Sequence, residues 1–291
     1  MLVLSEPDWL RRRAAHECRV RAWTDPHQRR AGRGEKHPVL DFMFSYYSYR
    51  PARLRRWHPG PDVALAGAAA LAYLDRPEYV STPDGVVLAP VSGCRLGTVR
   101  FARDLLVATA ERTPRLGCHG LHEWAMVYRQ PADAVRHADW PLRLGPAGTD
   151  RVVESLPVRC SHFDAFRFFT PPARRYNQLQ PSRSRQLELE QPGCLHANMD
   201  LFKWAYKLAP HSPAELVADC FELALAVRTL DMRAGPYDLS ALGHPPVAIE
   251  TPAGRAEYRS AQARFAELAV PLRSRLIALC DRLLANGSTV D

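Results

Sequence analysis

Apolar residues recur every three to four positions along most of the chain, and this period predicts a mainly helical fold. Helices are expected over residues 5–30, 38–50, 62–74, 97–112, 119–129, 196–208, 212–232 and 256–285. The helix over 38–50 has apolar or aromatic side chains on two faces, so it is either buried or presents aromatic rings to a ligand.

Two segments depart from the helical period. Residues 78–89 contain a Pro-Asp-Gly turn between β-prone residues and predict a hairpin. Residues 130–194 are rich in Pro, Gly and Arg and predict loops with short strands or turns. We therefore expect a mainly α fold, a single compact helical domain with a small β-hairpin element. In it, residues 1–60 would form a basic aromatic arm packed on a helical core of residues 61–291.

Nearly all of the excess positive charge lies in the first 60 residues. They contain thirteen basic and six acidic residues, while the whole chain carries a net charge of +8. Arginines contact phosphates and aromatic faces stack on unpaired bases, so this segment favours DNA as a partner. Its candidate nucleic-acid-binding residues are Tyr46, Tyr47, Tyr49, Arg50, Arg53, Arg55, Arg56 and Trp57. The alternative interpretation is a buried aromatic helix followed by a solvated basic loop.

The composition is that of a soluble globular protein, with 46% hydrophobic and 24% charged residues. No apolar run approaches the ~20 residues that span a bilayer, and the first residues turn polar too soon for a secretory signal. Seven scattered cysteines favour a reduced compartment over a disulfide framework. We therefore expect a cytoplasmic protein that binds no membrane, and the sequence predicts no protein partner.

Three short segments each place a histidine and a carboxylate close behind a cysteine. The segments run over residues 117–128, 159–169 and 193–204. Imidazole, thiolate and carboxylate groups are transition-metal ligands, so the segments predict a possible composite site. Its candidate ligands are His122, Cys160, His162, Cys194 and His196. The spacing matches no closed zinc motif, and the alternative is that the cysteines are buried as small hydrophobic residues.

Two of these segments also contain candidate catalytic carboxylates. Glu123, next to His122 in an apolar helix, would have its pKa raised by desolvation and could act as a general acid or base. An ion pair with an arginine is the alternative for Glu123. Asp200 shares a helical face with Lys203 and Trp204, which could bind a phosphate and stack on a base. A surface ion pair is the alternative for Asp200.

Four longer strings contain these aromatic, imidazole and carboxylate residues. They are Asp41-Phe-Met-Phe-Ser-Tyr-Tyr-Ser-Tyr-Arg-Pro, Gly120-Leu-His-Glu-Trp-Ala-Met-Val-Tyr-Arg, His162-Phe-Asp-Ala-Phe-Arg-Phe-Phe-Thr and His196-Ala-Asn-Met-Asp-Leu-Phe-Lys-Trp-Ala. In these strings, and from about residue 8 to residue 275, the chain resembles a group of actinobacterial proteins. Members of that group usually bear the name 3-methyladenine DNA glycosylase.

The resemblance implies an enzyme of DNA repair that excises alkylated purine bases. Such an enzyme flips the base out of the helix and hydrolyses its N-glycosidic bond with the help of a carboxylate. The catalytic residues would be Glu123, Asp200 and His122. No cofactor would be required, and with only three lysines the chain favours a monofunctional glycosylase without lyase activity. Two alternatives stay open: an enzyme that uses a transition metal, and a nucleic-acid-binding protein without catalysis.

Overall fold

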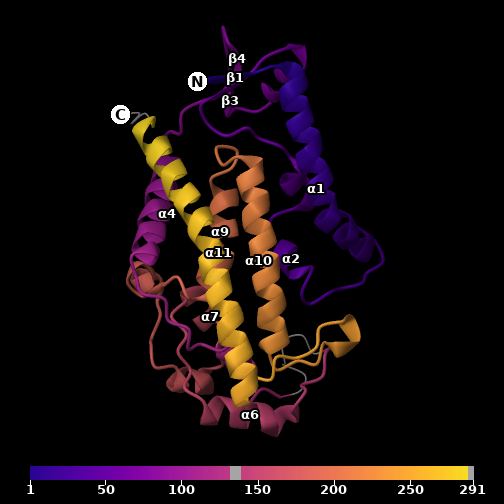
Figure 1. The fold of residues 1–291 in the computed structure, drawn as a ribbon, viewed down its shortest axis with the longest axis vertical. Helices are drawn as coiled ribbons and strands as arrows, with labels where there is room; N and C mark the ends of the chain where they lie inside the picture. Colours follow the sequence, from indigo (N-terminus) through magenta and orange to yellow (C-terminus); the bar gives the residue numbers. More distant parts are fainter. Residues whose placement is uncertain (132–138, 288–291) are drawn as a thin grey trace. The chain divides into compact units, whose positions relative to one another are not determined.

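Helices dominate the fold, as the sequence predicts (Figure 1). The structure, a computed structural model, describes residues 1–131 and 139–287. Helices account for 59% of the described residues and the strands form one four-stranded sheet, which confirms a mainly α fold with a small β element. Among the described residues, no helix is both long and apolar enough to cross a membrane.

The elements follow one another in the order given by their labels. The α-helices are α1 (Glu6–Gly32), α2 (Phe42–Tyr46), α3 (Pro51–Arg55), α4 (Cys94–Ala110), α5 (Leu121–Ala125), α6 (Gly145–Ser155), α7 (Phe163–Phe166), α8 (Gln186–Leu189), α9 (Leu195–Lys207), α10 (Ala214–Ala234) and α11 (Pro252–Ala285). Short 3-10 helices are η1 (Ala68–Tyr73), η3 (Pro171–Tyr176), η4 (Arg183–Arg185) and η5 (Ser240–Leu242). The strands are β1 (Leu2–Leu4), β2 (Val63–Leu65), β3 (Tyr79–Thr82) and β4 (Gly85–Leu88).

The chain divides into two compact units. Unit 1 contains Met1–Asp104, Leu201–Glu222 and Leu272–Asp291, and unit 2 contains Leu105–Asp200 and Leu223–Pro271. Helices α4, α9, α10 and α11 therefore contribute residues to both units. The expected arm of residues 1–60 lies within unit 1, and its separation from residues 61–291 stays a prediction.

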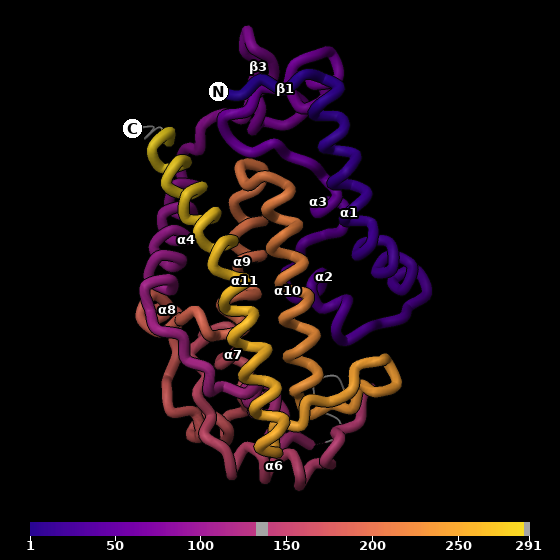
Figure 2. The backbone as a smooth tube through the Cα atoms, in the orientation of Figure 1, coloured from indigo at the N-terminus to yellow at the C-terminus, as the bar shows by residue number. Residues whose placement is uncertain are grey.

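The sheet of unit 1 lies beside the start of α1 (Figure 2) and has the strand order β1-β2-β4-β3. The hairpin expected over residues 78–89 is confirmed: β3 and β4 are antiparallel, with Tyr79 opposite Leu88. Gly85 has a φ of +127°, and a Cβ there would lie 2.3 Å from the carbonyl oxygen of Leu65. Only glycine therefore allows β4 to approach β2 this closely.

The helix expected over residues 62–74 is wrong in its first half. Residues Val63–Leu65 form strand β2, which pairs in parallel with the N-terminal strand β1. Only the later part is helical, as the 3-10 helix η1. Pairing with a strand far away in the sequence overrides the local Ala and Leu preference for helix.

Other boundaries also differ from the sequence-based expectation. The helix expected over 38–50 is the short α2, which ends before Ser48, a residue with a φ of +51°. The helix expected over 119–129 is reduced to α5. The segment 130–194 holds helices α6, α7 and α8 instead of loops and strands alone, and its residues 132–138 lie outside the described part.

Two tryptophans organise the hydrophobic core of unit 1. Trp9 of α1 stacks on Trp57, with ring centroids 6.4 Å apart, and both side chains are buried. Each indole N–H has an acceptor: Trp9 donates to the carbonyl of Ala66 at 3.0 Å and Trp57 donates to Oε1 of Glu215 at 2.8 Å. Buried indoles with satisfied N–H groups hold α1 against the sheet and the start of α10.

We predict that His58→Gln makes the protein less sensitive to acid. His58 is buried with its Nδ1 2.8 Å from the hydroxyl of Tyr79, and burial, together with the charges of Arg76 and Arg56, lowers its pKa to about 3. In the unfolded chain a histidine takes up a proton near pH 6.5, whereas folded His58 does not. Stability contributed by neutral His58 is therefore present above about pH 6.5 and is lost as the pH falls towards 3, by at most about 1.4 kcal/mol per pH unit.

Urea unfolding at pH 7 and pH 5, in a buffer without phosphate, measures this difference. The variant should lose less stability on acidification than the unmodified chain. An equal loss in the two proteins contradicts the prediction.

Candidate functional site

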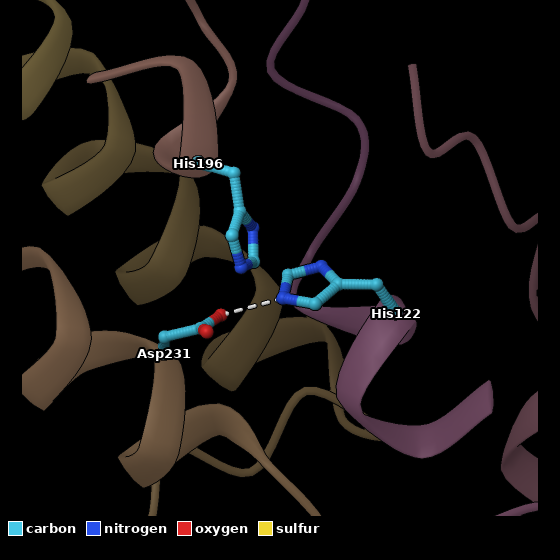
Figure 3. A group of neighbouring side chains, drawn as sticks. All are labelled: His122, His196 and Asp231. Atoms are coloured by element: carbon cyan, nitrogen blue, oxygen red, sulfur yellow. Dashed lines mark ion pairs between the residues drawn. The ribbon is translucent and has the colours of Figure 1, made fainter. Parts of the chain in front are cut away.

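Histidines from all three cysteine-containing segments meet in the interior of unit 2. His122 lies in α5, His196 in the first turn of α9 and Asp231 near the end of α10 (Figure 3). The possible ligand atoms of these three residues all lie within 4.8 Å of one another, and all three side chains are buried. His162, just before α7, stacks on His196 with ring centroids 5.4 Å apart.

Packing of α5 against the end of α10 sets the position of His122. Gly120 has a φ of +71°, and a Cβ there would lie 3.3 Å from a tyrosine ring, so the approach to α5 requires glycine. The indole N–H of Trp124 donates to the carbonyl of Ala234 at 2.8 Å. Ala234 lies about one helical turn after Asp231, so this bond holds His122 beside Asp231.

The shortest contact in this His–His–Asp cluster joins Nε2 of His122 to Oδ1 of Asp231 at 2.9 Å. No well-directed hydrogen bond joins these two buried atoms, and neither has another hydrogen-bond partner. The outer atoms of both groups have contacts instead. Sγ of Cys118 lies 3.5 Å from Nδ1 of His122, and Nη1 of Arg228 lies 3.4 Å from Oδ2 of Asp231. Side chains held from outside, with their inner atoms converging, are typical of metal ligands and their outer-shell partners.

The pKa values of the two histidines of the cluster are shifted in opposite directions. Burial alone would lower the pKa of His122, but the adjacent Asp231 carboxylate outweighs burial and raises that pKa well above its usual value. Burial and the neighbouring charge of His122 hold the pKa of His196 well below its usual value. His196 is therefore a neutral imidazole, the form that binds metals, and His122 carries a proton beside the Asp231 carboxylate. A metal ion would have to displace that proton.

A buried guanidinium lies next to the cluster. Nη1 of Arg228 is 2.8 Å from Oε1 of Glu123 and 3.4 Å from Oδ2 of Asp231, and all three side chains are buried. Glu123 is thus in an ion pair with an arginine, which is the alternative expected from its sequence. Its role as a catalytic carboxylate stays a prediction. Because Arg228 faces both carboxylates, it also orients Asp231.

Asp200, the other candidate carboxylate, pairs with His162. Oδ2 of Asp200 lies 3.2 Å from Nε2 of His162, and Oε1 of Glu190 lies 3.5 Å from the same nitrogen. The side-chain amide of Gln186 donates to Glu190 at 2.9 Å. These groups are buried, so a surface ion pair at Asp200 is wrong. The carboxylate belongs to a second imidazole–carboxylate pair within unit 2.

Cys160 and Cys194, the two cysteines predicted as metal ligands, do not belong to the cluster. Cys160 and Cys194 are buried, and burial raises the pKa of both thiols well above its usual value, which keeps them protonated. Among residues 1–131 and 139–287, the group with metal-ligand spacing contains His122, His196 and Asp231. Of the five ligands expected from the sequence, two are therefore in this group. Asp231 could not be predicted as a ligand from the sequence, because its place beside two histidines depends on how the end of α10 packs.

A pocket of about 470 Å³ opens in unit 2 next to these groups. Cys118, whose sulfur contacts His122, forms part of its wall. Ser161, the neighbour of His162 along the chain, forms another part. One residue of the pocket wall, Cys118, thus contacts His122, and another, Ser161, precedes His162 in the chain.

The remaining wall of the pocket is polar and basic. Exposed Arg115 and Arg159 line it, together with Gln178 and Gln191. Gln178 accepts a hydrogen bond from Nε of Arg159 at 2.8 Å. Gln191 accepts from the backbone N–H of Arg115 at 2.8 Å, so its amide is fixed in place. Two guanidinium groups beside a cavity of this size suit a small ligand with an anionic group.

The aromatic residues predicted to bind nucleic acid are mostly inside unit 1. Tyr47, Tyr49, Trp57 and Trp204 are buried, and Tyr46 is half-buried and stacks on Phe42 with centroids 4.8 Å apart. Stacking on a base needs an accessible ring face, so the burial of these rings favours the alternative of a buried aromatic segment. Their role in binding nucleic acid stays a prediction.

The basic residues predicted to bind nucleic acid differ in exposure. Arg50, Arg53 and Arg56 are exposed. Arg55 forms an ion pair with Asp25 and donates to Thr24 at 2.7 Å. Lys203 is half-buried, with its Nζ 5.2 Å from the centre of the Trp204 ring. Three of the four arginines therefore have guanidinium groups open to a phosphate.

No family model, curated protein or solved structure matches this chain. The resemblance to the glycosylase group thus stays an expectation from the sequence.

We predict that Arg228→Met destabilises the protein by about 3–5 kcal/mol, because it removes a buried guanidinium that faces two carboxylates. Arg233→Met is the matched control, since Arg233 lies on the same helix but forms a partly exposed pair with Glu257 at 3.4 Å. The control should cost less than about 1 kcal/mol. Denaturant unfolding measures both values. A loss for Arg228→Met no larger than the control's contradicts a structural role for the buried pair.

Proposed function

We propose that this protein is a metal-dependent enzyme whose transition-metal ion is bound by His122, His196 and Asp231. One observation carries the proposal. Two buried atoms, Nε2 of His122 and Oδ1 of Asp231, lie 2.9 Å apart without a well-directed hydrogen bond, and His196 reaches the same point (Figure 3). Unsatisfied polar atoms in a protein interior are costly, and a shared cation would satisfy both.

The ligand set indicates the class of metal. Two imidazoles and one carboxylate, with further positions open, are used by non-haem iron(II) enzymes and by catalytic zinc sites. When bound, such an ion supplies a Lewis acid or an activated water. The protein would contribute the supports already described: Cys118 beside His122 and Arg228 beside Asp231.

The pocket of unit 2 supports an enzymatic role over a purely structural one. Its wall includes Cys118, which contacts His122, and Ser161, which precedes His162 in the chain. Arg115 and Arg159 would bind an anionic part of the substrate and orient it there. His162, which pairs with Asp200, follows Ser161 of that wall in the chain, and this pair would hold or release a proton during the reaction.

We expect purified protein to contain, or to take up, about one equivalent of a transition metal such as zinc or iron. His122→Ala, His196→Ala and Asp231→Asn should each reduce the metal content at least tenfold, because each removes one of three ligands. His244→Ala, a histidine outside the cluster, should leave it unchanged. Elemental analysis measures the content, and circular dichroism verifies that each variant is folded. Folded variants that keep the full metal content would overturn the proposal.

Excision of alkylated purines from DNA is the second candidate function. The observation that favours it is the buried pair of Asp200 and His162 close to a pocket whose size lies in the usual range for ligands. In this hypothesis Asp200 or Glu123 assists hydrolysis of the glycosidic bond, His122 supports it, DNA is the partner and no metal is required.

Release of free base from methylated DNA, before and after metal removal by a chelator, separates the two candidates. The metal-dependent proposal predicts no base release by the metal-free protein. The second candidate predicts release that survives chelation and falls at least about a hundredfold in Asp200→Asn. Release that persists after chelation would reject the metal-dependent proposal for this reaction.

A further inference from the structure

Unit 1 contains a pocket of its own, lined largely by basic side chains. Its volume is about 400 Å³. The basic groups on its wall are Arg53, Arg56, Arg76, Arg95 and Lys207. They face one carboxylate, that of Glu78, and one buried imidazole, that of His58. With neutral histidine the wall has a net charge of +4.

Most of these basic groups have no acidic partner. Nη1 of Arg95 lies 3.6 Å from Glu78, and its Nη2 donates to the carbonyl of Ala209 at 2.7 Å. Within residues 1–131 and 139–287, no carboxylate forms an ion pair with Arg53, Arg56, Arg76 or Lys207. Four cations therefore share one pocket without local neutralisation. Cations gathered in one cleft repel one another and raise the local concentration of anions.

Arg76 provides the most specific indication. Its Nη1 is buried and has no hydrogen-bond partner, although buried guanidinium N–H groups are nearly always satisfied. Its guanidinium also lies over the ring of Tyr73, 5.8 Å from the centroid, which limits its orientation. A buried, oriented N–H without an acceptor in a basic pocket points to an acceptor supplied by a ligand.

His58 is buried at the same pocket and is coupled to its charge. Burial, and then the charges of Arg76 and Arg56, depress the pKa of His58 to about 3. The imidazole is therefore neutral near pH 7. It adds a polar group to the pocket without adding to its charge.

We infer that this pocket binds a small ligand carrying two or more phosphate groups, such as inorganic pyrophosphate or a nucleoside diphosphate. Arginine forks bind phosphate oxygens in pairs, and four charges in excess match the charge of a diphosphate group. The pocket volume suits a small molecule and cannot enclose a duplex. The stacked rings of Tyr49 and Tyr206, with centroids 4.6 Å apart, add an aromatic wall beside the basic groups. The inference is independent of the metal site proposed for unit 2.

Isothermal titration of the full chain at low salt, with pyrophosphate, ADP and orthophosphate in separate experiments, tests the inference. Pyrophosphate and ADP should bind with micromolar affinity, and orthophosphate at least tenfold more weakly. Tighter binding of ADP than of pyrophosphate identifies a nucleotide site, and equal affinities identify a site for the diphosphate group alone.

Arg56→Gln and Arg76→Gln should each weaken pyrophosphate binding at least tenfold. Arg56 is exposed, so its replacement leaves the fold intact, and Arg12→Gln is the matched control because Arg12 is an exposed arginine of the same unit outside the pocket. The control should change the affinity less than twofold. Absence of binding at millimolar pyrophosphate, or equal weakening by the control, would overturn the inference. Binding of a single-stranded oligonucleotide that pyrophosphate does not displace, with no binding of pyrophosphate itself, would overturn it as well.

Discussion

The interior of unit 2 depends on a buried guanidinium, that of Arg228. It faces Glu123 from α5 and Asp231 from its own helix, α10. Two carboxylates could not be buried so close together without such a partner, since desolvation and mutual repulsion would both oppose it. The residue next to Glu123 in the chain is His122, so the same pairing fixes the histidine beside Asp231. The pairing thus helps to set the positions of His122 and Asp231, two of the three candidate metal ligands.

The two units differ in the chemistry of their interiors. Unit 2 buries carboxylates and imidazoles, which attract cations, behind a wall that is polar and basic. Unit 1 collects arginines around a pocket and uses aromatic rings as its core. The excess positive charge of the first 60 residues is therefore not all available on an open surface. Two of its arginines, Arg53 and Arg56, line the pocket of unit 1, while others are paired with acids of the same unit.

The features that could be predicted from the sequence are those set by local pattern. Helices α4, α9, α10 and α11 follow from their apolar period, and the hairpin follows from Pro-Asp-Gly. Strand β2 could not be predicted, because one of its pairing partners, β1, lies about 60 residues earlier in the chain. The same limit applies to the sites. The histidines were identified by their chemistry, but Asp231 and Arg76 gain significance only from burial and from neighbours that are distant in sequence. Trp57 shows the opposite case. Its place in a basic segment suggested a contact with nucleic acid, but its side chain is buried in the core of unit 1.

The three members of the His–His–Asp cluster come from α5, α9 and α10 and lie far apart in the sequence. Each intervening loop must close before the donors can meet, and closure has an entropic cost. The cluster therefore does not exist in a partly folded chain that has formed only its local helices. An ion bound there would stabilise the assembled unit and not its parts, so occupancy and the last stage of folding would be thermodynamically linked.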